Sequence, residues 1–435
     1  MCSSALLGLA QVGAAQFQTA SINGAAGGIT VSNNLFFLTS PAKSEGMFSA
    51  FQTFAGNGQI SARIHRDARF PLKAGIVLSQ STNLTSLNAS RYAGMFLADS
   101  NAVFGRLLEV KGIPASTIKT NVAGEWLRVI REGNAFSGYY SADGTNWTQI
   151  SADSIEMPEQ IYASLAVSGG DARFSDVKIM SAKLVNPVQK TSIVLPANIS
   201  LSAIVNSFGS VPKSVEFFAE ANKIGEANAA PHKMVWTNAL GGSHSLIAKV
   251  TDETGAGFFT EPEVSEFKLP KASARFLGFD EVTKGNWKEK YGAEGHAIAN
   301  DSTNLASIVQ LTVIQGKSIT WEIPASEERS LLWGDSPKRI ASTWYHGTEV
   351  VLDLALADGY KHQIALYFLD WDKQERSTEV QVLDNLGNIL SVQKLMDYSN
   401  GKYLIWSALG DVTFKIKRDR GGNAIVSAIF SDPER

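Results

Sequence analysis

The sequence predicts an all-β chain made of β-sandwich domains in tandem. Short apolar or alternating segments recur along nearly the whole chain, which is typical of strands. Turn signals such as Gly56-Asn57-Gly58 and Asp143-Gly144 separate these segments, and long helical periodicity is hard to find. The 435 residues are enough for about two to four domains, and a hydrophobic content of 44% is enough to form their cores.

Composition argues against several classes of function. The net charge is −3 and charged residues make up 19% of the chain, so there is no electrostatic case for binding nucleic acid. Cys2 is the only cysteine, which excludes an internal disulfide and a cysteine-based metal site. No stretch is long and apolar enough to predict a membrane span. No nucleotide-binding or hydrolase motif occurs, so we expect a protein that is not an enzyme.

Residues 1–28 are interpreted as a leader or the remnant of a secretion signal. The run ALLGLAQVGAA is apolar and rich in small residues, and Gly13-Ala14-Ala15 resembles a signal cleavage zone. The usual basic start is missing, so the segment could instead hold the first strand of the first domain. Together with the domain types below, this predicts a secreted or cell-surface protein.

Residues 29–183 are predicted to form the first sandwich. In the segment QISARIH, Ile60, Ala62 and Ile64 lie on one face, as expected for a half-buried strand. The aromatic residues Trp126, Tyr139 and Trp147 are expected in the core, because aromatic side chains in sandwich strands usually pack inward.

Three stretches of this segment carry a resemblance to a known family: KAGIVLS, WLRVIREGNAFSGYYSADGTNWTQI and IYASLAVSGGDARFSDVKI. They resemble the concanavalin-like (laminin-G-like) jelly-roll modules of bacterial secreted proteins. The resemblance implies a jelly roll of a kind that is often attached to polysaccharide-active enzymes.

Residues 184–190 are predicted to be a linker because they contain a proline and have no pattern. Residues 191–270 follow as a compact unit of short strands. Val215-Glu216-Phe217-Phe218, Trp236-Thr237-Asn238 and the run from Leu246 to Asp252 resemble the bacterial immunoglobulin-like modules. That resemblance implies a spacer with no activity of its own.

Residues 271–435 are predicted to form a second jelly-roll sandwich, and they hold six of the nine tryptophans. The strand IALYFL is apolar throughout, which predicts that both of its faces are covered. The next strand alternates, with Val380 and Val382 inward. Trp321 and Trp406 are expected in the core because they share the parity of neighbouring apolar residues. The runs GNWK, WY and LYFLDWD resemble the galactose-binding-like (malectin-like) sandwiches, which implies carbohydrate binding.

The candidate binding residues are aromatic or planar, because sugars bind flat rings and planar hydrogen-bonding groups. The Gly-flanked segment GNWKEKYGAEG predicts an exposed loop, and LLWGDSPKR predicts another. Packing is the alternative for each candidate, and exposure decides between the two. Binding requires at least two of the tryptophan and tyrosine candidates to face solvent and to be roughly coplanar or line one groove, and burial of all of them would favour a structural role. The carbohydrate-binding candidates are Trp287, Tyr291, Trp333, Trp344, Tyr345, Trp371 and Arg376.

Asp370 and Asp372 are candidates for a Ca²⁺ site, since Ca²⁺ prefers carboxylate oxygens. The alternative use is an ion pair with Arg376 or Lys373 that holds the turn together. No other cofactor is expected.

The sequence supports three hypotheses of function. The first is a non-catalytic extracellular protein that binds polysaccharide through its terminal sandwiches. The second is a structural or adhesive cell-surface or matrix protein, which self-associates through sheet edges or the apolar N-terminal leader, or binds other cell-surface proteins. The third is an accessory part of a polysaccharide-degrading enzyme.

Overall fold

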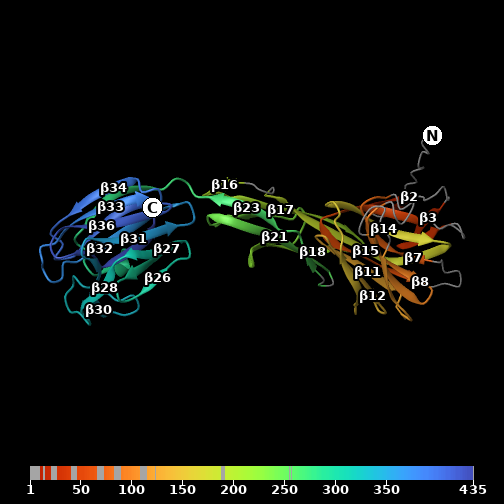
Figure 1. The fold of residues 1–435 in the computed structure, drawn as a ribbon, viewed down its shortest axis with the longest axis horizontal. Helices are drawn as coiled ribbons and strands as arrows, with labels where there is room; N and C mark the ends of the chain where they lie inside the picture. The colour runs from red at the N-terminus through yellow and green to blue at the C-terminus, as the bar shows by residue number, and fades with distance from the viewer. Residues whose placement is uncertain are drawn as a thin grey trace. The chain divides into compact units, whose positions relative to one another are not determined.

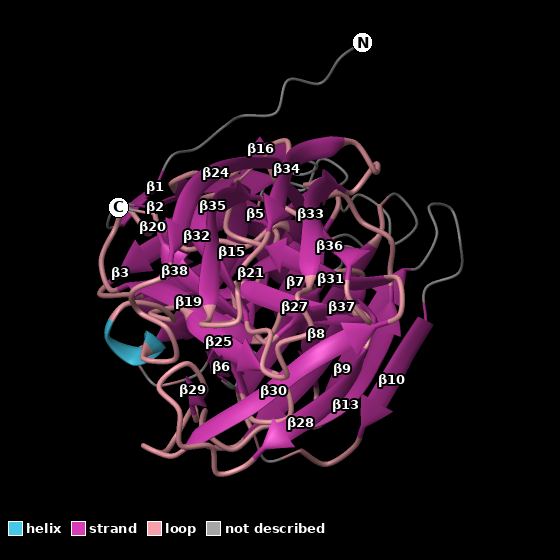
Figure 2. Ribbon diagram, turned by 90° about the vertical axis from the view of Figure 1, so that its left-hand side faces the viewer, coloured by secondary structure: helices cyan, strands magenta, loops and turns pink. Residues whose placement is uncertain are grey.

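The computed structural model describes residues 10–12, 15–20, 27–40, 47–65, 73–82, 90–107, 115–122, 124–187, 192–253, 255 and 257–434. Strands make up nearly all of their regular structure, and the helix among them is the 3-10 turn η1 (Trp287–Glu289) (Figure 2). The predicted all-β fold of tandem sandwiches is therefore confirmed. None of the helices in the described residues has the length and apolar character needed to cross a membrane.

The chain divides into two compact units (Figure 1). The first contains the described part of Met1–Thr191 with Ile199–Trp236 and His244–Ser265, and the second contains Ser192–Asn198, Thr237–Ser243 and Glu266–Arg435. Most of the predicted immunoglobulin-like segment thus belongs to the first unit.

The first unit is built on two antiparallel sheets. The first sheet has, in spatial order, β1 (Ala10–Val12), β2 (Ala15–Ala20), β5 (Phe48–Ala55), β14 (Gln160–Ser168), β7 (Lys73–Ser79), β8 (Tyr92–Ala98), β9 (Asn101–Leu107) and β10 (Ala115–Lys119). The second has β13 (Thr148–Ser154), β12 (Ala135–Ser141), β11 (Trp126–Glu132), β6 (Asn57–His65), β15 (Asp171–Asn186), β17 (Ile199–Phe208) and β20 (Lys233–Trp236), with β4 (Leu35–Thr39) pairing β15 and β3 (Gly28–Ser32).

Part of the predicted leader lies in this sandwich. Strand β2 pairs with β5, with Gln18 opposite Phe51. The alternative reading, a first strand within residues 1–28, therefore holds for 10–12 and 15–20. The other residues of the predicted leader, apart from 27 and 28, lie outside the described chain.

The core between the two sheets follows the predicted alternation. Ile60, Ala62 and Ile64 are all fully buried in it, together with Leu127 and Val129. Residues of the opposite parity point away from this core, because side chains alternate across a strand.

The core prediction for three aromatic residues of the first sandwich is therefore wrong. Trp126 lies one position before Leu127 and is half-buried on the outer face. Tyr139 pairs with Arg128 on that face, and Trp147 is half-buried beside Arg128.

Strand β15 crosses the predicted boundary at residue 183. It pairs with β6 up to Ala182 and with β17 from Ile179 to Asn186. The linker predicted for 184–190 is wrong for 184–186, which are part of this strand, and 188–190 lie outside the described residues. Continuous pairing with β6 and β17 joins the first sandwich to the immunoglobulin-like segment within one sheet.

The immunoglobulin-like segment forms further pairs within each unit. In the first unit, β18 (Pro212–Ala219) pairs β19 (Asn222–Ala227) and β21 (Gly242–Asp252), and β21 pairs β22 (Gly257–Phe259). In the second unit, β16 (Ser192–Val194) pairs in parallel with residues 266–268 of β23 (Glu263–Lys268), with Ser192 opposite Glu266, and the first three residues of β23 belong to the first unit.

The second unit contains a sandwich of three sheets. The first has β24 (Ser273–Asp280), β35 (Lys402–Leu409), β32 (Lys361–Phe368), β38 (Ala428–Pro433), β25 (Gly295–Ile298) and β26 (Thr303–Leu305) in order. The second has β27 (Val309–Gln315), β31 (Glu349–Leu356), β36 (Val412–Arg420), β33 (Ser377–Asp384) and β34 (Ile389–Leu395). The third has β28 (Lys317–Glu322), β30 (Arg339–His346) and β29 (Leu331–Leu332), with β37 (Ala424–Val426) also pairing β30.

The main core of this sandwich lies between β32 and β35 on one side and β31, β33 and β36 on the other. Ile364, Leu366 and Trp406 meet Val380 and Val382 there. The inward placement of both valines and of Trp406 is as predicted.

Strand β32 is also buried on its second face, as its apolar sequence predicts. Ala365 and Tyr367 belong to a second cluster of buried residues on that face. The loops around η1 and β29 cover this cluster. Four of the candidate binding residues, Trp287, Tyr291, Trp333 and Trp371, belong to this second layer.

Trp321 differs from its prediction. It is half-buried against the main core, but its neighbours Ile319 and Ile323 are 43% and 54% exposed. Strand β28 lies at the edge of its sheet, so it pairs on one side only.

Candidate functional site

Trp287 and Tyr291 are core residues, and the prediction that they are exposed is wrong. Only 4% of Trp287 and 3% of Tyr291 is accessible to solvent. The Trp287 ring lies 5.0 Å from the Phe430 ring, and the Tyr291 ring stacks on Tyr403 at 4.5 Å. These contacts bury large apolar rings on the outer face of the β24-β35-β32-β38-β25 sheet, which stabilises the segment that carries η1.

Asp280, at the end of β24, holds this segment in place. Its Oδ2 accepts hydrogen bonds from Lys290 Nζ at 2.7 Å and from the Tyr291 hydroxyl at 2.8 Å. Its Oδ1 accepts from the backbone N–H groups of Val282 and Thr283. Burial opposes ionisation, but the bonds from Lys290 and Thr283 outweigh it and keep the pKa of Asp280 well below its usual range.

A cleft of about 940 Å³ lies between the η1 segment and the sheet; we call it the η1 cleft. Its lining combines apolar side chains, Leu277 and Ile405 among them, with the planar polar groups of Arg275, Asn304 and Gln363. Leu277 is 40% exposed although it lies on a strand. The full lining is Arg275, Leu277, Trp287–Ala293, His296, Asn304, Gln363, Ile405, Asp432, Pro433 and Glu434.

The charged groups at the cleft are of both signs. Lys288 donates to the Ser336 carbonyl at 3.0 Å, and the Arg275 guanidinium lies 3.6 Å from Glu434. His296 packs against Trp287 with ring centroids 4.5 Å apart. Burial lowers the pKa of His296, so this ring is neutral at pH 7. The lining therefore offers hydrogen bonds and apolar surface, without a strong field of one sign.

The other aromatic candidates do not line the η1 cleft. Trp333 is half-buried with Lys338 Nζ 5.3 Å above its ring, and its buried Nε1 has no hydrogen-bond partner among the described residues. Trp344 and Tyr345 are half-buried against the main core. The Arg329 guanidinium covers Trp371 at 4.2 Å. Of the predicted residues, Trp287 and Tyr291 lie together at the η1 cleft, but both are buried, so this pair does not provide the two solvent-facing rings that the prediction requires.

Asp370, Asp372 and Arg376 form an ion-pair cluster, so the alternative to the Ca²⁺ site holds. Arg376 Nη1 contacts the carboxylates of Asp370 and Asp372, and Arg376 Nε donates a hydrogen bond to Asn423 Oδ1 at 2.9 Å. Arg376 is 5% exposed and Asp370 is 2% exposed, so neither can reach a ligand at the surface. The guanidinium lies where a cation would have to bind, which contradicts the prediction of a Ca²⁺ site. The described residues contain no group of three or more His, Cys, Asp or Glu suited to a metal ion.

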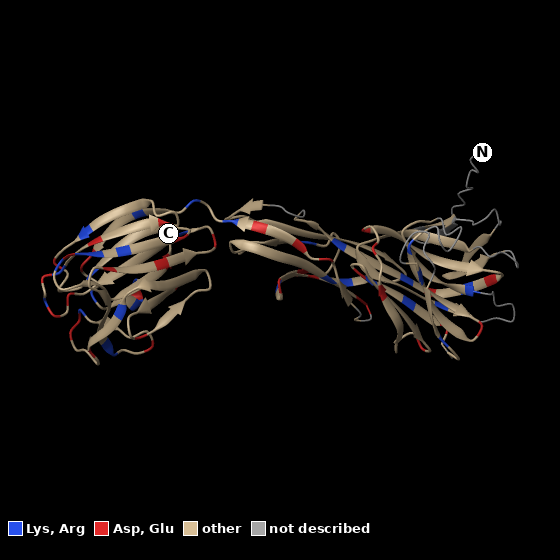
Figure 3. Ribbon diagram, in the orientation of Figure 1, with Lys and Arg blue, Asp and Glu red and all other residues tan. Residues whose placement is uncertain are grey.

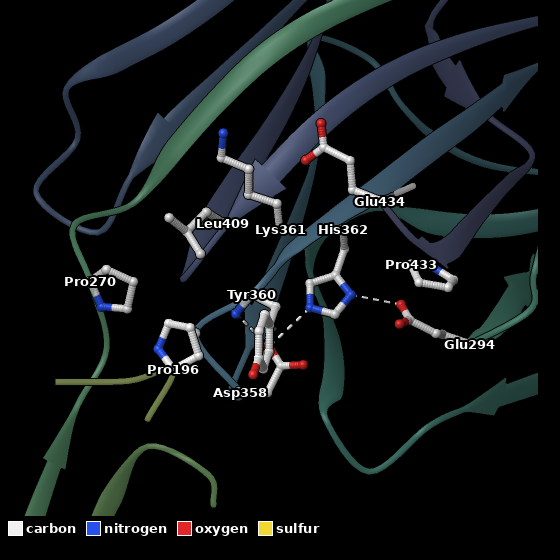
Figure 4. A pocket seen from close by; sticks show the side chains of 11 residues that line it. Pro196, Pro270, Glu294, Asp358, Tyr360, Lys361, His362, Leu409, Pro433 and Glu434 are labelled. Carbon is white, nitrogen blue, oxygen red and sulfur yellow. Dashed lines mark hydrogen bonds and ion pairs between the residues drawn. The ribbon is translucent and has the colours of Figure 1, made fainter. Parts of the chain in front are cut away.

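A second cavity, of about 740 Å³, shares Pro433 and Glu434 with the η1 cleft. Figure 4 shows His362 in its wall between two carboxylates. His362 Nδ1 lies 2.7 Å from Glu294 Oε2, and Nε2 lies 3.0 Å from Asp358 Oδ1. Burial favours the neutral ring, but the bonds to Asp358 and Glu294 outweigh burial and raise the pKa of His362. This arrangement fixes the ring and the ends of two loops.

The sequence patterns missed most of the lining of the η1 cleft. Leu277 and Ile405 alternate with core residues, so strand parity could have placed them on the outer face. Gln363 comes directly after the buried His362, so the same alternation could have placed Gln363 on the outer face. Arg275 and Asn304 had no signal, since exposed polar residues on strands are ordinary.

Basic and acidic residues are interspersed over the strands and loops of each unit (Figure 3). This mixed pattern agrees with the small net charge of −3. Long-range steering of a highly charged polymer is therefore not expected.

Several solved structures resemble parts of the chain. Fibronectin(III)-like modules of Clostridium thermocellum CbhA share 22% identity over 20% of this chain and 94% of theirs, with a TM-score of 0.19. A carbohydrate-binding module from Bacillus subtilis shares 15% sequence identity over 35% of this chain and 90% of its own, with a TM-score of 0.27. A prokaryotic β-1,3-1,4-glucanase from a mouse hindgut metagenome shares 9% sequence identity over 34% of this chain and 80% of its own, with a TM-score of 0.25. Similarities this low carry no argument about function.

Comparison with family models gives a firmer result for the middle of the chain. No curated protein matches the chain. Residues 181–248 match the family model of a bacterial immunoglobulin domain. The match starts within β15, ten residues before the predicted start at 191, in agreement with the shared sheet. The chain is thus a multi-module β-sandwich protein that contains a segment similar to the bacterial immunoglobulin domains.

Proposed function

We propose that this chain is a non-catalytic, extracellular carbohydrate-binding protein that holds a glycan in the η1 cleft. The observation that carries the proposal is the mixed lining of that cleft. Leu277 and Ile405 offer an apolar surface for a sugar ring, and Gln363, Asn304 and Arg275 offer planar hydrogen-bonding groups for hydroxyls. An extracellular setting is supported by the immunoglobulin-like segment.

The hydrogen bonds of the cleft carboxylates favour binding over catalysis. Glycoside hydrolysis needs two carboxyl groups on either side of the scissile bond. Asp432 Oδ1 accepts the backbone N–H of Ala293 at 2.7 Å, and Glu434 Oε2 accepts from Ser407 at 2.7 Å. Glu434 also lies beside Arg275. These two groups are occupied in holding loops and strands together, and the third carboxylate of the lining, Glu289, lies on the exposed side of η1.

The test is a tryptophan-fluorescence titration of the full chain with soluble β-glucan, xylan, galactan and mannan, with and without Ca²⁺. Trp287 lines the cleft, so its emission reports on occupancy. We expect one glycan to give a saturable change that does not need Ca²⁺. Leu277→Ala should weaken that binding about tenfold, or about 1.4 kcal/mol, through lost apolar contact. Gln363→Ala should weaken it about fivefold through a lost hydrogen bond.

The matched control is Leu386→Ala, because Leu386 is also an exposed leucine of the second unit and is 80% accessible outside the cleft. It should bind as the wild type does. Trp287→Ala is not a useful probe, since removing a buried tryptophan costs about 3–5 kcal/mol of stability. Equal binding by Leu277→Ala and wild type would contradict the site.

A complete lack of glycan binding by the folded chain would favour the structural hypothesis. The observation that would then matter is the edge strand β28, which exposes Ile319 and is followed directly by the exposed Ile323. Unpaired edges with apolar side chains can pair with another chain. Concentration-dependent sedimentation of the same sample would decide for self-association.

A further inference from the structure

The outer face of the first sandwich carries an arginine held between two aromatic rings. Arg128 Cζ lies 4.9 Å from the Tyr139 ring centroid and 4.4 Å from that of Trp147. Arg128 and Tyr139 are directly opposite each other on β11 and β12, and Trp147 precedes β13. Contacts of a guanidinium with aromatic faces hold it flat and in one orientation.

This arginine lacks the partners that other arginines of the sandwich have. Arg131, on the same strand, donates to the carbonyl groups of Gly133, Glu159, Met157 and Pro158. Arg63 pairs with Glu125 at 3.0 Å. The side chain of Arg128, in contrast, forms no hydrogen bond or ion pair with the described residues, and its buried Nε has no acceptor. Burial lowers the pKa of Arg128, which an added anion would oppose.

A second cation lies on the same row of the sheet. Ser61 is opposite Arg128 on one side and opposite Lys178 on the other. Residues directly opposite each other in a sheet point to the same face, so Lys178 and Arg128 share a face with the short Ser61 side chain between them. Their Cα atoms are two strand spacings apart, or roughly 10 Å. Lys178 is half-buried and has no ion pair among the described residues.

The acidic residues near this row are occupied. Glu125 pairs with Arg63. Asp143, in the hairpin turn, accepts from Asn146, Thr145 and Ser141. That turn packs on Trp126, since a Cβ at Gly144 would lie 2.8 Å from its ring, and the φ of +77° there suits glycine. The row therefore combines two cations, flat aromatic rings and no free carboxylate among these neighbours.

We propose that this row is a second ligand site, which binds acidic polysaccharide through the carboxylate of a uronic acid residue. The Arg128 guanidinium supplies a planar pair of N–H donors that match a carboxylate, and Lys178 adds charge. The exposed parts of Tyr139 and Trp147 offer apolar surface to the sugar ring beside it. This goes beyond the proposed function of the η1 cleft, because the two sites lie in different units and take different sugars.

The test is calorimetric titration of the full chain with oligogalacturonate, with its fully methyl-esterified form and with dextran sulfate. We expect oligogalacturonate to bind, more weakly as salt rises, and the esterified form to bind at least tenfold more weakly. Arg128→Gln should weaken oligogalacturonate binding at least tenfold and leave neutral-glycan binding at the η1 cleft unchanged. Arg128→Lys should weaken oligogalacturonate binding severalfold, because lysine keeps the charge but lacks the planar donors.

The control is Arg91→Gln, which removes the same charge from another partly exposed arginine of this sandwich. It should bind as wild type does. If Arg128→Gln melts earlier than wild type, Lys178→Gln takes its place, with a severalfold loss expected. Equal binding of both oligogalacturonate forms, no binding, or binding of dextran sulfate alone would overturn the assignment to a carboxylated sugar. Loss of neutral-glycan binding by Leu277→Ala alone bears on the η1 cleft and not on this site.

Discussion

Single side chains of the second unit show how a buried charge is kept. Arg376 contacts two carboxylates and Asn423, and His362 lies between Glu294 and Asp358. Each is at least 95% buried, at 5% and 2% exposure, and a buried charge is stable only when it is paired. Both therefore act as clamps that join segments far apart in the sequence.

His362 should make the stability of the second unit depend on pH. The pKa of His362 is higher in the folded chain than in the unfolded chain, where it is about 6.5. Its contribution to the free energy of unfolding is therefore fully present below about pH 6.5, and it is lost as the pH rises through the pKa of the folded state. The loss is about 1.4 kcal/mol for each unit by which the folded pKa exceeds the unfolded one. Urea unfolding of the full chain between pH 5.5 and 9, followed by tryptophan fluorescence, measures it.

The control for this prediction is His346→Gln, because His346 is half-buried on β30 and does not line the cavity. It should keep the wild-type slope, whereas His362→Gln should flatten it. An unchanged slope in His362→Gln would assign the pH dependence to other groups. Glu434, Lys361 and Tyr360 are the remaining titratable residues of that cavity.

At the scale of elements, β15 determines how the first unit is joined. It pairs with β6 on one side and with β17 on the other, so one strand belongs both to the first sandwich and to the immunoglobulin-like segment. The η1 segment has a comparable role in the second unit. It covers one face of β32 and β35, and Asp280 holds it there.

Ala182→Pro should separate the two parts of the first sheet. Ala182 is opposite Asn57 on β6 and Val205 on β17, and it is 1% exposed. Proline removes a backbone donor, which a central strand does not tolerate, so we expect a loss of roughly 3 kcal/mol or more. Hydrogen exchange should rise in both β6 and β17. Ile118→Pro, on the exposed edge strand β10, should cost much less, and unchanged exchange in β17 would refute this role of β15.

At the scale of the whole molecule, the chain has three sandwich-like segments in sequence but two compact units. The shared sheet explains the difference, because strands in continuous pairing open together. The six tryptophans of residues 271–435 report mainly on the second unit.

Differential scanning calorimetry of the full chain should therefore show two transitions. The first unit should unfold as one, with the first sandwich and most of the immunoglobulin-like segment together. Fluorescence should follow mainly the transition of the second unit. Three separate transitions would mean that β15 does not couple its two neighbours.

The fold could be predicted from the sequence because its signals are local. Alternation and turn residues identified most strands, including β32 with both faces covered and β33 with Val380 and Val382 inward. Aromatic residues were harder to place. The same alternation puts Trp126 and Arg128 on the outer face, but the large apolar rings suggested a core.

The sequence by itself determined the strands, the sandwich class and the immunoglobulin-like segment, since periodicity and turn chemistry depend on near neighbours. Tertiary structure decided which faces are covered, because the covering segments come from distant positions. It buried Trp287 and Tyr291, gave Asp370 and Asp372 to Arg376, and left Arg128 without a carboxylate. Whether a residue can bind a ligand depends on which segments cover it, and the local sequence pattern does not carry that information.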